Sequence, residues 1–304
     1  MRTSVPTPAT VAGFTAARDC IADYASLAKP RILAMAVLTT VAGFLLATGG
    51  AIPEGILVPL LLGTTLVGAG TNAWNHLLER EVDARMERTR GRPLPAGRLE
   101  ARSALLFAFT ATGSGIAILA LGTNLLVAML GAAAFLLYAF VYTPLKQRSS
   151  LCTIVGAIPG ALPPLFGWAA ARGSLGPEAW TLFGVLFFWQ LPHFLAIAWL
   201  YREDYARAGF PMLPVVDAAA TGRQVLLQTA ALTLVSVAPP LAGMAGRVYV
   251  AAALLLGLVF LLFGIVFARR PTPRSARALF LASLVYLPAL LAFLVGGALA
   301  QIGP

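Results

Sequence analysis

The chain from Gly55 to Arg98 reads GILVPLLLGTTLVGAGTNAWNHLLEREVDARMERTRGRPLPAGR. Its first part, about residues 55–78, is an apolar run longer than the roughly 20 residues that a helix needs to cross a bilayer. Its second part is densely charged, and four of the twelve acidic residues in the chain fall between Glu79 and Glu87. The stretch therefore predicts a membrane helix that ends in a concentrated set of charges.

The composition extends this prediction to the whole chain. Its 304 residues are 59% hydrophobic and 11% charged, with a mean hydropathy of +0.83, whereas soluble domains are about 45–50% apolar and about 25% charged. Backbone groups in lipid must be hydrogen-bonded within the spans, and the apolar runs are too long and uniform for barrel strands. We therefore expect an all-α integral membrane protein, built as one helical bundle around a central cavity.

Nine apolar runs have the length of membrane spans. They cover about residues 31–50, 55–78, 103–122, 125–142, 151–171, 180–200, 224–244, 247–268 and 277–300. The predicted transmembrane domain covers residues 27–304. Residues 1–26 are expected to form an N-terminal cytoplasmic segment that is mobile over 1–10, with a short interfacial helix over about 14–29.

The basic residues alternate with the spans. Of the 22 lysines and arginines, 20 lie in the N-terminal segment or in the connections that follow the second, fourth, sixth and eighth spans. The positive-inside rule then places the N-terminus in the cytoplasm and the C-terminus outside. The net charge of +10 is therefore explained mainly by topology, and nucleic-acid binding is not expected.

Two acidic clusters follow spans of the same predicted orientation. Asn75, Glu79 and Asp83 are spaced by four, so on a helix they share one face; Glu203 and Asp204 follow the sixth span. Proteins hold Mg²⁺ with one or two carboxylates plus substrate phosphates. We expect the clusters to face one cavity and bind Mg²⁺ with a diphosphate, although a solvated, salt-bridged loop is the alternative. The cations expected to neutralise the diphosphate further are Arg80, Arg90, Arg92, Lys146 and Arg202.

Three further side chains, two at the end of a span and one within a span, allow more than one role. Tyr142 and Lys146 end the fourth span, where they would either bind a phosphate or act as an interfacial tyrosine with a topology-setting lysine. His193 lies within the sixth span, where an ionisable residue suggests function. It would ligate a heme iron, transfer a proton, or form a structural hydrogen bond to a neighbouring helix.

The segment from Asn75 to Arg98 resembles the first aspartate-rich motif of the UbiA family of membrane prenyltransferases, which reads Asn-x-x-x-Asp-x-x-x-Asp. Other segments are similar to the branch of that family whose acceptor is heme. They are Ala28-Lys-Pro-Arg31, Arg92-Pro-Leu-Pro, Tyr142-Thr-Pro-Leu-Lys146, Trp189-Gln-Leu-Pro-His-Phe194 and Glu203-Asp-Tyr-Ala-Arg-Ala-Gly-Phe-Pro-Met-Leu-Pro214. Two departures occur: Glu79 stands where the family usually has Asp, and Leu191 replaces a usual Pro.

The resemblance implies Mg²⁺-assisted ionisation of farnesyl diphosphate, attack by a vinyl group of heme B, and addition of water to give heme O. Asn75, Glu79 and Asp83 would then hold Mg²⁺-diphosphate together with Glu203 and Asp204. Tyr142 and Lys146 would help to bind the diphosphate, and His193 would contact heme. The implied setting is the plasma (cell inner) membrane with the site facing the cytoplasm, and heme A synthase or oxidase-assembly proteins would be partners.

Three competing functions remain at this point. A sibling enzyme would prenylate another aromatic acceptor such as a quinone precursor, but the Trp189–Phe194 and Pro211–Pro214 segments argue against it. A transporter or channel would place its carboxylates near the middle of the bilayer, whereas these lie at the ends of spans. A heme-binding structural subunit would not need two acidic clusters.

Overall fold

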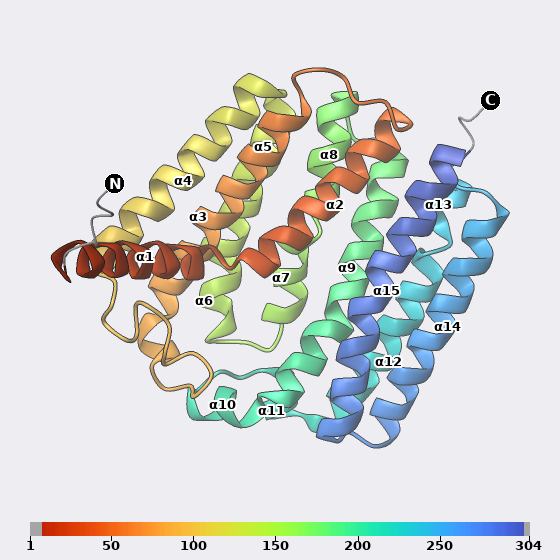
Figure 1. Ribbon diagram of the computed structural model, residues 1–304. Helices are drawn as coiled ribbons and strands as arrows, with labels where there is room; N and C mark the ends of the chain where they lie inside the picture. Colours follow the sequence, from red (N-terminus) through yellow and green to blue (C-terminus); the bar gives the residue numbers. More distant parts are fainter. Residues whose placement is uncertain (1–7, 301–304) are drawn as a thin grey trace, which may run out of the picture.

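The computed structural model describes residues 8–300, and every regular element within that range is a helix. The elements are α1 (Pro8–Ala28), α2 (Pro30–Thr48), α3 (Leu57–Asp83), α4 (Ala101–Gly122), α5 (Leu125–Leu136), the π-helix η1 (Leu137–Tyr142), α6 (Thr143–Lys146), α7 (Cys152–Gly160), α8 (Pro163–Arg172), α9 (Pro177–Leu200), α10 (Arg202–Arg207), α11 (Leu213–Val216), α12 (Ala218–Val235), α13 (Ala238–Leu241), α14 (Arg247–Arg269) and α15 (Pro273–Ala300). Figure 1 shows the long helices side by side, with α1 lying across the ends of α3 and α4.

The prediction of nine spans is confirmed over the described residues, which contain nine helices long and apolar enough to cross a bilayer. Some spans are single continuous helices. The fourth span consists of α5, η1 and α6, and the fifth consists of α7 and α8. The second span was expected to end at residue 78, but α3 continues to Asp83. The first acidic cluster therefore lies on the helix itself rather than on the loop that follows it.

The N-terminal helix begins earlier than expected. The sequence predicted an interfacial helix over about 14–29 and a mobile segment over 1–10, but α1 already begins at Pro8. Residues 1–7 of that predicted segment lie outside the described residues. At its other end α1 stops before Lys29, whose φ of 54° interrupts the helix ahead of Pro30. The chain therefore turns at Lys29 from a helix across the bundle into the first span.

Prolines interrupt one span and leave another continuous. The fifth span is broken between α7 and α8, where Pro163 and Pro164 supply no backbone N–H to continue the helical hydrogen bonds. Pro192 lies inside the sixth span, where α9 runs through it as one helix from Pro177 to Leu200. The helix therefore breaks at the proline pair of the fifth span and not at the proline of the sixth.

Close packing between α2 and α8 depends on two glycines. A Cβ atom on Gly43 would overlap the carbonyl oxygen of Pro164, and one on Gly167 would overlap that of Thr40. Between them, Thr40 Oγ1 donates a hydrogen bond to the Pro163 carbonyl at 3.0 Å. Small residues that allow such backbone contact are the usual means of joining helices in membranes.

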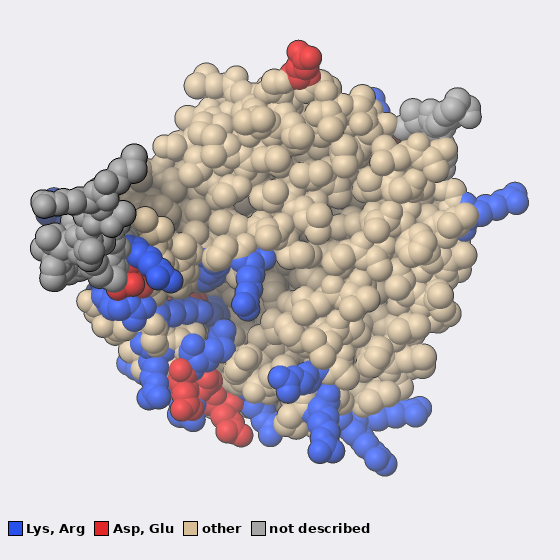
Figure 2. All heavy atoms as spheres, viewed as in Figure 1, with Lys and Arg blue, Asp and Glu red and all other residues tan. Residues whose placement is uncertain are grey.

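Charged side chains gather at one end of the bundle, where α3 and α9 end and α4 and α15 begin. We call this the basic end. In Figure 2 lysine and arginine side chains crowd this end, with acidic side chains among them, while most of the remaining face is uncharged. The strongly uneven distribution matches the alternation of charge seen along the sequence.

Candidate active site

The last three turns of α3 carry a buried polar face at the basic end. Asn75, Glu79 and Asp83 are 3%, 1% and 0% exposed, respectively. Their spacing by four residues on a continuous helix places them on one side. Buried charges are costly unless they are paired, so the partners of these side chains determine what the face can do.

Glu79 is paired with Lys146. The Lys146 ammonium donates to both carboxylate oxygens of Glu79 at 3.0 Å, and both side chains are almost fully buried. The same ammonium lies 4.7 Å from the centre of the Phe210 ring. Lys146 is the last residue of α6, which directly follows the π-helix. The end of the fourth span therefore places the Lys146 ammonium against the buried face of α3.

Asn75 is held from two directions. Its side-chain oxygen accepts a hydrogen bond from the Lys29 ammonium at 2.8 Å, and its Nδ2 donates to Thr143 Oγ1 at 3.3 Å. Burial, followed in importance by the nearby Arg92 charge, lowers the pKa of Lys29 to about 7. Lys29 has a left-handed backbone conformation. For a residue other than glycine, this conformation costs on the order of 1–3 kcal/mol of stability and is maintained only where surrounding contacts fix it.

Among the described residues, one carboxylate oxygen of Asp83 accepts a hydrogen bond and the other does not. Arg92 Nη1 donates to Asp83 Oδ2 at 2.6 Å, while Asp83 Oδ1 is buried and has no hydrogen-bond partner among the described residues. Thr89 Oγ1 donates to the Asp83 carbonyl at 2.9 Å and so folds the following loop back onto the helix end. A buried carboxylate oxygen without a donor is an acceptor available to a cation.

Asp204 of the second acidic cluster contacts the loop that directly follows the first cluster. Its carboxylate accepts the backbone N–H groups of Glu87 at 3.4 Å and of Arg88 at 3.3 Å, and it is paired with Arg207. Desolvation alone would raise the pKa of Asp204, but these hydrogen bonds and the Arg207 charge outweigh it and hold the pKa below its ordinary value. Asp204 thus fixes the loop after α3 to the helix α10. Glu203, its neighbour, is exposed.

The arginines predicted to neutralise a diphosphate are placed differently from one another. Arg92 lies on Asp83 and is only 21% exposed. Arg80 and Arg90 are exposed and pair with Glu81 and Glu87, while Arg202 lies over the Trp199 ring at 4.8 Å. Of these four, only Arg92 touches the buried face of α3.

Tyr142 and His193 lie on other surfaces of the bundle interior. The Tyr142 ring packs against Gly156 of α7 and lies 4.8 Å from the Tyr138 ring. His193 faces α15, where its Nδ1 is 2.7 Å from Ser283 Oγ. Among the described residues, neither side chain is hydrogen-bonded to the acidic face of α3. His76 is buried, and neither of its ring nitrogens has a partner in the same range.

Two contributors were not singled out as site residues from the sequence. Lys29 lies in the Ala28–Arg31 segment and Thr143 in the Tyr142–Lys146 segment, but the sequence assigns neither of them a role in the site. The signal for Lys29 was its place immediately before Pro30, where the helical backbone conformation is disfavoured. Its contact with Asn75, 46 residues away in the chain, is visible only in the fold.

The donor set fits a cation that is completed by a substrate. Over residues 8–300 no group of three or more His, Cys, Asp or Glu side chains is arranged to enclose a metal ion. The face of α3 offers two carboxylates and one amide, with Asp83 Oδ1 free. Mg²⁺ is usually bound in this way, through one or two carboxylates with the remaining ligands from phosphates and water.

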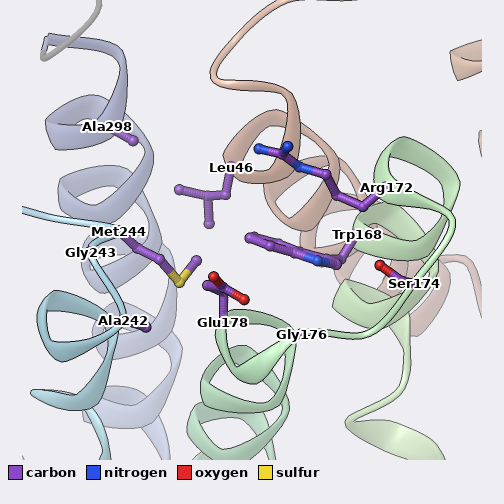
Figure 3. A pocket seen from close by; sticks show the side chains of 10 residues that line it. All are labelled: Leu46, Trp168, Arg172, Ser174, Gly176, Glu178, Ala242, Gly243, Met244 and Ala298. Atoms are coloured by element: carbon purple, nitrogen blue, oxygen red, sulfur yellow. The ribbon is translucent and has the colours of Figure 1, made fainter.

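A separate pocket of about 580 Å³ lies at the opposite end of the bundle. Figure 3 shows the side chains of Leu46, Trp168, Arg172, Glu178 and Met244 around it, with the Glu178 carboxylate between Met244 and Trp168. None of the site residues expected from the sequence lines this pocket. The acidic face of α3 and this pocket are therefore different features of the molecule.

Similar proteins share most of the chain. A relative from Solibacter usitatus, named protoheme IX farnesyltransferase, is 47% identical and covers 88% of this chain and 95% of its own. One of the same name from Koribacter versatilis is 43% identical, with 90% and 92% covered. Similarity at this level over nearly whole chains is expected only between members of one family.

Solved structures agree on the fold. A structure concerning digeranylgeranylglyceryl phosphate synthase has a TM-score of 0.79 at 16% identity and covers 92% of this chain and 99% of its own. A UbiA homologue from Archaeoglobus fulgidus, solved with DMAPP and Mg²⁺, has a TM-score of 0.65 at 17% identity, with 90% and 99% covered. The model of the UbiA prenyltransferase family matches residues 36–293. The chain therefore belongs to the UbiA prenyltransferase family.

Proposed function

We propose that this protein transfers a farnesyl group from farnesyl diphosphate to a vinyl group of heme B, giving heme O. The structural observation that carries the proposal is the buried acidic face of α3, on which Lys146 and Arg92 pair with Glu79 and Asp83 while Asp204 holds the loop that follows. The identity of the substrates is supported by relatives that are 41–47% identical and share one name, protoheme IX farnesyltransferase.

The metal ligands would come from both clusters. Glu79, Asp83 and the amide oxygen of Asn75 would hold Mg²⁺ from α3, with Asp204 and the more exposed Glu203 on the side of α10. When bound, Mg²⁺ supplies positive charge that stabilises the diphosphate as a leaving group. Lys29, Lys146 and Arg92 already balance the buried oxygens, so these cations can turn toward the diphosphate when it enters.

The reaction begins with cleavage of the C1–O bond of farnesyl diphosphate. The bonding electron pair leaves with the diphosphate, whose added negative charge Lys146 and Arg92 stabilise, and Tyr142 would orient it. The allylic cation is attacked by the π electrons of the heme vinyl group, which forms a carbon–carbon bond and moves the positive charge onto the former vinyl carbon. Water adds there and releases a proton. The apolar bundle limits earlier capture of the cation by water.

The exposed arginines have a different role from the buried ones. Arg80, Arg90 and Arg202 lie near the site but are occupied by Glu81, by Glu87 and by the Trp199 ring, respectively. Their charge raises the local concentration of an anionic substrate at the basic end. The positive-inside rule supports an orientation in which this end faces the cytoplasm, in the plasma membrane.

One assay tests the function. Purified protein in lipid nanodiscs is incubated with heme B, farnesyl diphosphate and Mg²⁺, and the heme products are analysed by mass spectrometry. The expected product has the mass of heme B plus a farnesyl group and one hydroxyl group, because the added water loses a proton. A parallel incubation replaces heme B with a hydroxybenzoate acceptor. The proposal fails if heme B is unchanged or if the hydroxybenzoate is prenylated equally well.

A further inference from the structure

The His193 ring lies between two aromatic rings in the contact between α9 and α15. Trp189, one turn earlier on α9, stacks on it with ring centres 5.1 Å apart and an interplanar angle of 23°. Phe280 of α15 lies 5.0 Å away at 33°. Trp189 is itself fixed, because its Nε1 donates to the Ser283 carbonyl at 2.8 Å. The imidazole thus has a defined plane, set by two aromatic rings.

The hydrogen bonds of Ser283 determine the tautomer of this imidazole. Ser283 Oγ lies 2.5 Å from the Phe280 carbonyl, an oxygen that can only accept, so the hydroxyl proton is directed there. The same Oγ lies 2.7 Å from His193 Nδ1. With its proton already used, the hydroxyl can only accept from the ring, and Nδ1 must therefore carry a hydrogen. Ser283 is 0% exposed, so water does not compete for this arrangement.

The other ring nitrogen is left with a free lone pair. In the neutral Nδ1–H tautomer, Nε2 is an acceptor, and it makes no hydrogen bond within the described part of the chain. His193 itself is partly exposed, unlike the buried Ser283 behind it. The cluster therefore leaves one ring nitrogen with a free lone pair, beside aromatic rings that can pack against a flat apolar ligand.

We propose that Ser283 is a positioning residue that holds His193 as the Nδ1–H tautomer, so that Nε2 is the axial ligand of the acceptor heme iron. The inference rests on the proposed function. Histidines that bind metals usually donate their other N–H to a fixed acceptor, which sets the tautomer and raises the basicity of the ligating nitrogen. Ser283 supplies this acceptor here. Coordination requires no proton transfer, because the Nε2 lone pair is already free.

The position of His193 along α9 agrees with this role. It lies seven residues before the end of α9, or about 10 Å at the helical rise of 1.5 Å per residue. The same helix end leads directly into α10, which carries Asp204. An iron held at His193 therefore keeps the porphyrin at the basic end, on the helix that also positions the second acidic cluster.

The test uses heme B alone and measures its coordination. Wild-type protein and Ser283→Ala in nanodiscs are titrated with heme B, and resonance Raman spectra of the ferrous complexes record the iron–histidine stretching band. We expect Ser283→Ala to weaken heme binding by about 10–100-fold and to move this band to lower frequency, because Nε2 loses basicity. His193→Gly should lose the band and regain one when free imidazole is added.

Two further variants separate this role from a general effect on folding. Ser236→Ala removes another fully buried serine hydrogen bond to a ring residue of α15, Ser236 Oγ to Tyr286 OH at 2.7 Å, and should leave the band unchanged. Ser283→Thr keeps a hydroxyl and should restore the wild-type band. An unchanged band and affinity in Ser283→Ala would overturn the proposal while leaving heme farnesylation intact. Unaltered heme B in the product assay would instead overturn the proposed function.

Discussion

The Lys146 ammonium lies 3.0 Å from both carboxylate oxygens of Glu79, and both side chains are almost fully buried. The pair joins the end of the fourth span to the end of the second. Because an isolated buried charge is far more costly than a paired one, each residue depends on the other for its place in the fold. The pair therefore contributes to stability as well as to the binding of an anion.

Removing one member of this pair should cost more stability than removing both charges. We expect Lys146→Met to lower the free energy of unfolding by about 3–5 kcal/mol, because Glu79 is left buried and unpaired. The double variant Lys146→Met/Glu79→Gln should recover most of that loss while remaining inactive. Denaturant unfolding in detergent micelles, combined with the product assay, measures both effects. Additive losses in the double variant would contradict the coupling.

Asp83 should be needed for activity but not for folding. We expect Asp83→Asn to lower turnover by on the order of 100-fold or more, the range seen when one group that stabilises transition-state charge is removed. The apparent Mg²⁺ requirement should rise as well, because the free Oδ1 is an available cation ligand. The measurement is initial rate against Mg²⁺ concentration, with chelator as the blank.

Glu81 provides the matched control for Asp83. It lies two residues away on α3, but its side chain is 78% exposed and, within residues 8–300, pairs only with Arg80 at 3.6 Å. Glu81→Gln should therefore keep the wild-type rate and Mg²⁺ dependence. Equal losses in both variants would show that general charge at the helix end matters, rather than a metal ligand at Asp83.

The sequence predicted the parts of this site that lie on single helices. Nine apolar runs and the alternation of basic residues were sufficient for the spans, and a spacing of four placed Asn75, Glu79 and Asp83 on one face. Contacts between distant segments were not predictable in this way. The hydrogen bond from Lys29 to Asn75 and those from the Glu87 and Arg88 backbone to Asp204 depend on how the loops fold back.

Asp204 should control the order of the loop after α3. Because its carboxylate accepts the N–H groups of Glu87 and Arg88, Asp204→Asn should increase amide hydrogen exchange over residues 84–92. The exposed Glu203 is the control, and Glu203→Gln should leave the exchange unchanged. Protection in Asp204→Asn equal to that of the wild type would reject the contact as an anchor of the loop.

The same contact predicts a direction of pH dependence. The folded pKa of Asp204 lies below its ordinary value, which is about 3.9. A depressed carboxyl pKa contributes stability that is present above the unfolded pKa and is lost as the pH falls through the folded one. Protection of the loop should therefore be constant near neutral pH and decline only below about pH 4. A decline centred near pH 6–7 would point to another group.

Substitutions of Arg92 and Arg90 should have very different effects on activity, although the two residues are two positions apart and carry the same charge. Arg92 donates to the buried Asp83 carboxylate at 2.6 Å, whereas Arg90 is 68% exposed and lies 3.8 Å from the surface residue Glu87. We expect Arg92→Gln to weaken farnesyl diphosphate binding and to lower turnover by at least about 10-fold, because charge-assisted hydrogen bonds are among the stronger ones.

Arg90→Gln removes the same charge without touching the buried face, and exposed ion pairs contribute only about 0–1 kcal/mol. Its turnover should stay close to wild type, while its rate of substrate capture should fall modestly and only at low ionic strength, where long-range attraction is least screened. Initial rates at subsaturating farnesyl diphosphate, measured at low and high salt, separate the two effects. Equal, salt-dependent losses in both variants would mean that Arg92 acts through long-range attraction rather than by contact at Asp83.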